Sequence, residues 1–576
     1  MRSCALASSD TLTVSPSGQI NVGIDNTRLF VWMALFLMMW FTYRAWLTDF
    51  SSEPITAPAE GGFGAVPELS PELPELEALD DALPSLTAPA APTGAPDRPA
   101  TAPERVIRVR TDVFDLLIDT QGGDLIRADL PLYPVDKDNP DLPVRLLDYT
   151  PGNRWVFQTG FRGVGEGDEP NHLAQFTSAR TEYVLADFDE ELVVTLDWQS
   201  QGPLRAQKIY TFRRGQYGIG LTLVIENQAD VPWSGAPYLQ LFRHHVPVER
   251  SYTSVASYSF RGPVLYDGDK YEKLDVEDLE AEPVNQSLAG GWLASIQHHF
   301  LAAAVPPAED VVRYQAITRG SDYVLTALSP VREVAPGGRV TYLAQLFVGP
   351  KLQDQLAATG DALELTVDYG KLTILSQPLF WLLAKVHGFV NNWGWSIVIV
   401  TLLIKLTFYK LTQASGRSMA KMRKLQPRMK ALQERYKEDR QALSQAMMEL
   451  YKREKVNPAA GCLPILIQMP FFFAFYWVLI ESVEIRQASF MLWITDLSSR
   501  DPFFVLPLLM GAAMLFQTRL NPAPPDPVQA KVMQIMPVAF TALFAFFPAG
   551  LVLYWLTNTA LSILQQWRIN QVIGAS

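Results

Sequence analysis

Hydrophobic and polar residues follow two unlike patterns along the chain. Over residues 105–350, short runs alternate apolar and polar positions and are separated by Gly, Pro and Asp turns. Alternation with period two is typical of strands that bury one face, so we expect many antiparallel strands there. From about residue 393 onward the apolar runs are longer and continuous, which is typical of membrane-spanning helices. The chain is therefore predicted to join a large β domain to a helical membrane domain.

Two strands of the β domain are predicted to form a hairpin at Gly122-Gly123. Residues 113–119 and 124–130 lie on either side of this pair, and a Gly-Gly pair between such runs is a hairpin signal. Four further strand-like runs are residues 191–198, 207–214, 220–227 and 338–348. Many short strands joined by tight turns predict a large antiparallel β-sandwich.

The β domain offers little catalytic chemistry. It contains two adjacent histidine pairs, His244-His245 and His298-His299. Neighbouring side chains on a strand point to opposite faces, so we expect neither pair to bind a metal. The chain has two cysteines, too few for a disulfide framework. It carries no nucleophile motif and no nucleotide-binding loop, so no catalytic residue and no cofactor are expected.

The segment before the β domain is expected to hold a membrane anchor and a linker. Residues 29–47 are mostly apolar and lack a small-residue cleavage site, so residues 25–50 are interpreted as an uncleaved transmembrane helix. Residues 51–104 are rich in Pro, Ala and Glu, and such a segment cannot bury a core, so it is predicted to be a disordered linker. Residues 1–24 are polar and are interpreted as an N-terminal extension.

A lysine lies well inside the next apolar segment, residues 393–414. A charge in a membrane-spanning helix costs about 2.5–3.5 kcal/mol on insertion scales, so such a residue usually faces water or a partner. On one helix face the spacing aligns four residues: Thr401, Lys405, Phe408 and Thr412. This stripe is interpreted as the wall of a hydrophilic pocket inside the bilayer. The alternative is that the Lys405 side chain snorkels to the membrane surface along its own apolar stem.

An amphipathic helix is predicted just before this span, within residues 365–392. Its apolar residues recur at helical spacing, with Lys385 and His387 on another side. The pattern favours a helix lying in the membrane interface. The alternative is a helix packed on the β domain.

A strongly basic segment, residues 415–460, follows the span. Although the whole chain has a net charge of −12, this segment carries twelve basic residues against five acids. Two narrow apolar stripes predict two antiparallel helices joined near residues 437–440. Basic loops stay cytoplasmic, and an anionic partner such as ribosomal RNA is compatible with this charge. The residues assigned to docking are Arg423, Lys424, Arg428, Lys430, Asp439 and Arg440.

Four more spans are predicted at about residues 462–480, 503–517, 531–547 and 549–563, within residues 461–573. Each is short against a hydrocarbon core of about 30 Å. The polar, aromatic and proline residues singled out in them are Pro464, Gln468, Pro470, Pro537, Tyr554, Trp555 and Asn558. With the basic segment inside, the β domain falls outside and the C-terminus inside. This six-span topology satisfies the positive-inside rule throughout.

The spans of the helical domain contain one buried cation and no Asp or Glu. Coupled transporters normally need acidic relays in the membrane, and no repeated halves are visible, so a secondary transporter with a ligand-capturing β domain is the weaker alternative. A third interpretation is a membrane-anchored periplasmic carbohydrate enzyme. A cationic pocket instead suits a passive task, in which polar parts of another chain are held briefly while its apolar helix partitions into lipid.

Three motifs of the helical domain resemble the YidC family of membrane protein insertases. They are residues 421–427 (KMRKLQP), 456–470 (VNPAAGCLPILIQMP) and 547–555 (FPAGLVLYW). Residues 290–294 and 346–350 resemble the Gram-negative branch of that family, which has a large periplasmic domain. The likeness covers roughly residues 105–573.

The resemblance implies a multi-pass inner-membrane insertase, foldase and chaperone for nascent membrane proteins, acting alone or with the Sec translocon. The ribosome is a further implied partner, and DNA is not. The β domain would be periplasmic and similar to sugar-mutarotase folds without their activity. The cation of the family's substrate groove is usually arginine, whereas Lys405 keeps the charge here without the bidentate fork. Other implied groove residues are Thr401, Tyr409, Gln468 and either Tyr554 or Trp555.

Overall fold

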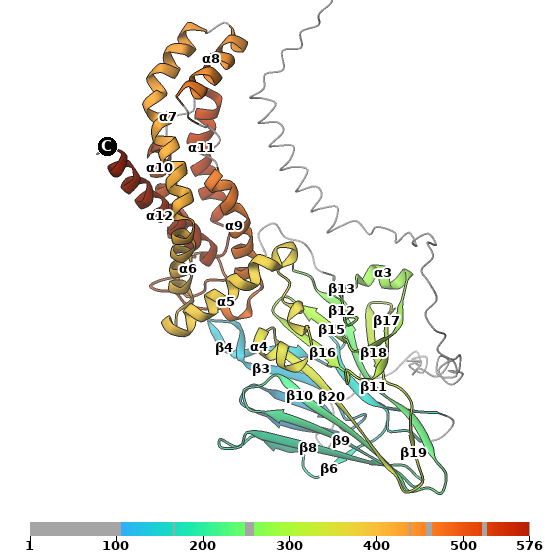
Figure 1. Cartoon of the computed structure of the whole chain (residues 1–576). Helices are drawn as coiled ribbons and strands as arrows, with labels where there is room; N and C mark the ends of the chain where they lie inside the picture. The colour runs from blue at the N-terminus through green and yellow to red at the C-terminus, as the bar shows by residue number, and fades with distance from the viewer. Residues whose placement is uncertain are drawn as a thin grey trace, which may run out of the picture.

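The computed structural model describes residues 105–164, 168–247, 259–436, 439–454, 456, 463–520 and 527–574. The extension, anchor and linker expected over residues 1–104 lie outside this part of the chain. Figure 1 shows a strand-rich part, coloured blue to yellow-green, joined to a helical part in yellow to red. The helices gather at one end of the strands.

The strand-rich part consists of two packed sheets. The eleven-stranded sheet contains β1 (Val106–Arg110), β2 (Asp115–Asp119), β3 (Asp124–Asp136), β4 (Asn139–Leu147), β5 (Trp155–Gly163), β7 (Glu182–Val184), β11 (Trp233–His244), β14 (Val284–Ala289), β17 (Val311–Arg319), β18 (Asp322–Leu328) and β19 (Arg332–Val334). The nine-stranded sheet contains β6 (Thr177–Ser178), β8 (Glu191–Gln199), β9 (Leu204–Arg213), β10 (Gly218–Asn227), β12 (Gly262–Tyr266), β13 (Tyr271–Lys273), β15 (Trp292–Gln297), β16 (Phe300–Val305) and β20 (Arg339–Pro350).

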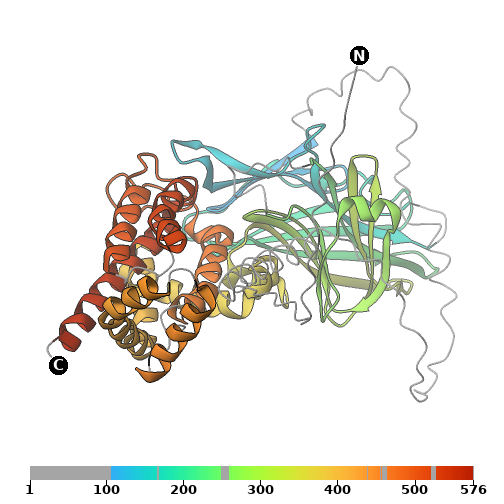
Figure 2. The same ribbon diagram turned by 90° about the horizontal axis from the view of Figure 1, so that it is seen from above.

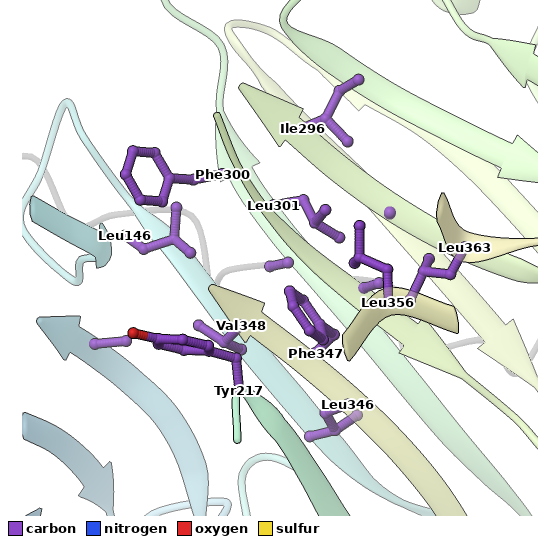
Figure 3. Packing of buried hydrophobic residues seen from close by; sticks show 14 of the residues in the cluster. Leu146, Tyr217, Ile296, Phe300, Leu301, Leu346, Phe347, Val348, Leu356 and Leu363 are labelled. Atoms are coloured by element: carbon purple, nitrogen blue, oxygen red, sulfur yellow. The ribbon is translucent and has the colours of Figure 1, made fainter. Parts of the chain in front are cut away.

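Neighbouring strands pair antiparallel, apart from β1 and β7, which are parallel. The main path of the first sheet runs β14-β17-β18-β11-β5-β3-β2-β1-β7, and that of the second runs β13-β12-β15-β16-β20-β10-β9-β8-β6. The inward-facing apolar side chains of both sheets form one core. Figure 3 shows Leu356 of α4 (Gln353–Thr359) beside Leu301 and Phe347 of the second sheet, so the segment after β20 extends this core.

The hairpin expected at Gly122-Gly123 is confirmed. Both glycines have positive φ, +77° and +65°, and they join β2 to β3. A Cβ on Gly122 would lie 2.5 Å from the carbonyl oxygen of His172, so the turn requires glycine for space as well as for conformation. The other predicted strand-like runs coincide with β8, β9, β10 and β20.

A lysine is buried between the sheets next to this hairpin. The Lys208 side chain is fully buried, and its Nζ donates to the carbonyl oxygen of Thr159 at 2.8 Å and to that of Gly122. Asp124 Oδ1 lies 3.9 Å from the same Nζ. Burial raises the pKa of the Asp124 carboxyl and lowers the pKa of the Lys208 ammonium. The pair ties the hairpin of one sheet to β9 of the other.

Helix α3 (Val276–Ala281) belongs to the β domain. The second part contains the helices α5 (Thr373–Val390), α6 (Trp393–Thr407), α7 (Tyr409–Arg435), α8 (Arg440–Arg453), α9 (Leu463–Glu481), α10 (Val505–Leu520), α11 (Pro527–Phe544) and α12 (Ala549–Gly574). The long helix α12 packs against α6, α7, α9 and α10. Helices α7 and α8 extend away from the strands (Figure 1).

The continuous helix expected from residue 393 to 412 is wrong. The chain breaks at Phe408, and α6 and the start of α7 meet at 63°. Taken together, these two pieces are long and apolar enough to cross a bilayer, whereas no single helix in the described ranges meets that test. Because of the bend, Lys405 lies in the last turn of α6, and Thr412 does not continue its stripe.

Polar contacts join the two parts of the protein, beside an apolar core cluster that includes side chains of both. The β3–β4 hairpin reaches the helical part (Figure 2), where Lys137 Nζ donates to the carbonyl oxygen of Gln487 at 2.8 Å. His298 and His299 lie in the turn between β15 and β16, and Nε2 of each is within 3.0 Å of the Ile480 carbonyl oxygen. Their rings stack with centroids 3.8 Å apart. The expectation that this pair points to opposite faces is therefore wrong, because a turn does not alternate its side chains as a strand does.

Candidate functional site

Lys405 is the centre of a polar cluster between three helices. Its half-buried Nζ donates to Ser562 Oγ at 2.8 Å and to Gln468 Oε1 at 3.3 Å. Among the described residues, the ammonium has no ion-pair partner. An ammonium has three N–H donors, so one donor is left for another acceptor.

Helices α9 and α12 supply the other members of what we call the Lys405 cluster: Lys405, Gln468, Asn558 and Ser562. Gln468 bridges the other two helices, since its Oε1 accepts from Lys405 and its Nε2 donates to Asn558 Oδ1. The Ser562 hydroxyl donates to the Asn558 carbonyl oxygen one turn earlier, at 2.7 Å. Each side chain thus orients its neighbour, and the arrangement fixes the position of the charge.

Two members of the cluster were not assigned from the sequence. Asn558 was noted only as a residue of the last span, and Ser562 was missed. A signal was present, because Tyr554, Asn558 and Ser562 follow one another at intervals of four and so share one face of α12. Serine is too common in membrane helices for that spacing to have identified its partner.

The two aromatic candidates of the last span lie on different faces of α12. Tyr554 is buried and stacks on Phe475 of α9 with ring centroids 4.5 Å apart. Trp555 is less buried, and its ring centroid lies 4.8 Å from that of Phe472 and 5.4 Å from that of Phe544. Tyr554 lies on the same face of α12 as Asn558, whereas Trp555 packs against aromatic rings of α9 and α11.

In the described part of the chain, Thr401 and Tyr409 form no side-chain hydrogen bond with the Lys405 cluster. The buried Thr401 hydroxyl donates to the Ile397 carbonyl oxygen within α6 at 2.6 Å. Tyr409 is the first residue of α7, beyond the bend, and its hydroxyl has no hydrogen bond to the cluster in the described part of the chain.

The three prolines singled out all lie inside helices. Pro464 falls in the first turn of α9, where its missing N–H would have no partner in any case. Pro470 and Pro537 lie further inside α9 and α11. A proline there frees the carbonyl four residues earlier and favours a bend.

The basic hairpin consists of α7 and α8, packed through Leu425 and Met429 against Val456. Arg428 forms an ion pair with Glu454 at 2.7 Å. Lys424 and Lys430 are exposed. Arg423 belongs to α7 and Arg440 to α8, but the side chains of these two arginines lie outside the described part. Asp439 caps α8, since its Oδ1 accepts the backbone N–H groups of Gln441 and Ala442.

Helix α5 has one buried and one exposed apolar face. It packs against α6 and α9 rather than lying free, and Leu383 is fully buried. On the other face, Ile374, Trp381 and Phe389 are 91, 61 and 89% exposed. Large apolar side chains exposed in a row on one helix indicate contact with lipid or with another protein.

Two family models match the chain. The model described as "YidC periplasmic domain" matches residues 106–382, and "60Kd inner membrane protein" matches residues 385–575. The chain is 46% identical over 567 residues to a membrane protein insertase YidC of Thioalkalivibrio sulfidiphilus, covering 96% of this chain and 99% of that protein. It is 50% identical over 479 residues to the YidC insertase of Methylococcus capsulatus, covering 83 and 87%.

Among solved structures, a crystal structure of an active YidC insertase with its first transmembrane domain resolved has 20% identity and a TM-score of 0.37, covering 80% of this chain and 93% of that one. A galactose mutarotase-like protein from Lactobacillus casei has 10% identity and a TM-score of 0.28, covering 42 and 99%. At these TM-scores neither likeness adds to the assignment.

Proposed function

The chain belongs to the YidC family of membrane protein insertases, and from this premise we propose that it inserts nascent membrane proteins into the inner membrane by way of the Lys405 cluster. It is an inner-membrane protein with a periplasmic domain, which is the β-rich part. The relatives give no support to a secondary transporter. The proposed role requires binding and release and no covalent reaction.

The single observation that carries the proposed mechanism is that the Lys405 ammonium forms no ion pair with any residue that the structure describes. Its ammonium is held by two neutral acceptors, from Gln468 and Ser562, and keeps one donor free. A carboxylate or an unsatisfied backbone carbonyl of an entering chain can therefore bind there at a lower desolvation cost than in lipid. Because the cluster offers the client a single charge, which already donates to two neutral groups, binding stays weak enough for release once the apolar helix of the client enters lipid.

We propose six spans with the β domain in the periplasm and the α7–α8 hairpin in the cytoplasm. The exposed basic side chains of the hairpin support this orientation under the positive-inside rule. The exposed apolar face of α5 supports its place in the outer membrane interface. The broken pair α6 and α7 would supply the second span, with Lys405 beside the break.

Further partners follow from the charge of the hairpin. Lys424 and Lys430 are exposed and belong to a segment with an excess of basic residues, which suits an anionic surface such as ribosomal RNA. The protein is also proposed to act either alone or with the Sec translocon in the membrane. A basic-to-glutamine change at Lys424 and Lys430 should weaken ribosome binding at low salt in a sedimentation assay.

Photocrosslinking to a stalled single-span nascent chain tests the proposed function. Crosslinkers at 468, 558 and 562 should capture the client, and the captured segment should change as the chain lengthens. Lys405→Glu should impair insertion more than Lys405→Ala, because a carboxylate repels acidic client groups. Lys410→Glu is the matched control, since Lys410 is exposed and lies beyond the bend. Full insertion by the Lys405→Glu variant would overturn the mechanism.

A further inference from the structure

A pocket in the β domain lies apart from the Lys405 cluster and has no role in the function proposed above. Its volume is about 510 Å3. Arg145 of β4, Arg243 of β11 and Arg261 line it, and among the described residues that line it none is Asp or Glu. Figure 1 shows β12, which begins next to Arg261, and β15 at the edge of the strands that is nearer the helices. The pocket wall therefore carries concentrated positive charge.

Arg243 is held rigidly in this wall. Its guanidinium lies 3.8 Å from the centroid of the Trp155 ring. Its Nη1 donates to Ser295 Oγ at 2.8 Å and to the Ile296 carbonyl oxygen at 3.1 Å, and its Nη2 donates to Gln297 Oε1 at 3.3 Å. A guanidinium has five N–H donors, so two remain beyond these three bonds. All of these contacts are with neutral groups, so they leave the charge of Arg243 unneutralised.

The other two arginines increase the positive charge. In the described ranges Arg261 forms no ion pair, and burial, with the nearby Arg243, lowers the pKa of its guanidinium. Arg145 binds Asp129 at 2.8 Å, but that carboxylate is shared with Arg127. One carboxylate thus serves two arginines, and the pocket retains an excess of cations that an anion would neutralise.

Two contacts bring the pocket next to the end of α9. His298 follows the last residue of β15, a strand that lines the pocket, and its Nε2 lies 3.0 Å from the Ile480 carbonyl oxygen. Ser259, two residues before Arg261, donates to Glu481 Oε1 at 2.8 Å. Under the topology proposed above, this end of α9 lies at the outer membrane surface. The pocket would then face the level of the lipid headgroups.

We propose that this pocket binds the phosphate group of an anionic ligand, with Arg243 and Arg261 donating to the phosphate oxygens. Planar guanidiniums match phosphate oxygens in pairs, and such charge-assisted bonds are about twice as strong as neutral ones. An anionic phospholipid headgroup and a soluble phosphate ester share this chemistry. Only the choice between these two sources rests on the proposed function and its topology.

Calorimetric titration of the full chain in a neutral detergent tests the site. The probes are glycerol 1-phosphate, short-chain phosphatidylglycerol and short-chain phosphatidylcholine. Arg261→Gln removes a side chain that forms no ion pair in the described ranges, and Arg243→Lys keeps the charge but loses the fork. Arg205→Gln, an exposed arginine on β9 outside the pocket, is the matched control.

We expect phosphatidylglycerol to bind with a stoichiometry of one, and Arg261→Gln and Arg243→Lys each to weaken it about tenfold, with Arg205→Gln unchanged. Equal affinity for glycerol 1-phosphate would assign the site to soluble esters, and much tighter lipid binding would assign it to headgroups. Binding that is the same in all four proteins, or no binding of either anionic probe, would overturn the proposal. The assay contains no client, so its failure leaves the Lys405 mechanism untouched. Conversely, a loss of client crosslinks at positions 468, 558 and 562 would leave phosphate binding unchanged.

Discussion

Replacing Lys208 by methionine is expected to destabilise the β domain strongly. The Lys208 side chain is 0% exposed, and its Nζ contacts Asp124 at 3.9 Å, the Thr159 carbonyl oxygen at 2.8 Å and the Gly122 carbonyl oxygen. Methionine has nearly the same length and fills the same space. The substitution therefore removes the charge and both hydrogen bonds while leaving the packing of the core almost unchanged.

The size of the destabilisation follows from the buried groups that lose their partner. Removing one partner of a buried ion pair costs about 3–5 kcal/mol, because the other charge is left in a medium of low polarity. The two abandoned carbonyl groups are part of the same loss, so their cost is not added a second time. Burial already raises the pKa of Asp124, so this carboxyl can be neutralised by protonation. The destabilisation should accordingly be smaller at pH 5 than at pH 8.

Urea unfolding of the full chain in detergent, followed by pulse proteolysis with antibody detection of the β domain, measures this change. The double variant Lys208→Met with Asp124→Asn should recover most of the stability, since neither charge is then buried alone. Lys270→Met, at an exposed lysine, is the control. A Lys208→Met protein within about 1 kcal/mol of the parent at pH 8 would refute this account of the buried pair.

Three further predictions concern the helical part and its junction with the strands. Ser562→Ala should reduce insertion by up to about tenfold in reconstituted vesicles, because a hydrogen bond to the charged Lys405 is lost, while Ser562→Thr retains it. Burial raises the pKa of Glu484 to about 7, so the stability that its protonated form contributes is present below pH 4.5 and is lost as the pH rises from 4.5 to 7. Glu484→Gln should therefore raise the melting temperature at pH 8 and leave it unchanged at pH 4. A Cβ on Gly511 of α10 would lie 2.0 Å from Thr541 Oγ1, so Gly511→Ala should cost about 1–3 kcal/mol in thermal unfolding, with partial rescue by Thr541→Ala.

The strands were predictable because their signals are local. Alternation fixes which face of β8, β9 or β10 is buried, and the glycine pair at residues 122–123 marks a tight turn that few other sequences form. The sheet order was not predictable in the same way. The pairing of β11 with both β5 and β18 joins segments far apart in the sequence, and no periodicity specifies such partners.

Side-chain partners were predicted less well than positions. Lys405 was identified by its cost in a membrane, and Gln468 by its polarity within an apolar run. That the two share a hydrogen bond depends on how α6 and α9 pack, which the sequence does not state. The prediction for the paired histidines after β15 was wrong for a related reason. The turn brings both rings to the Ile480 carbonyl oxygen of α9.

The break at Phe408 explains how the membrane domain holds a lysine. If residues 393–412 formed one long helix, Lys405 would lie in its interior, where a charge costs about 2.5–3.5 kcal/mol of insertion free energy. The structure ends α6 at Thr407, so the ammonium lies in the last turn, where the negative end of the helix dipole contributes about 0.3–1 kcal/mol. The two hydrogen bonds that the ammonium donates to Gln468 and Ser562 are worth about 1.5–3 kcal/mol each. These terms together offset the cost without any snorkelling, so the charge can stay within the helix cluster and remain available to another chain.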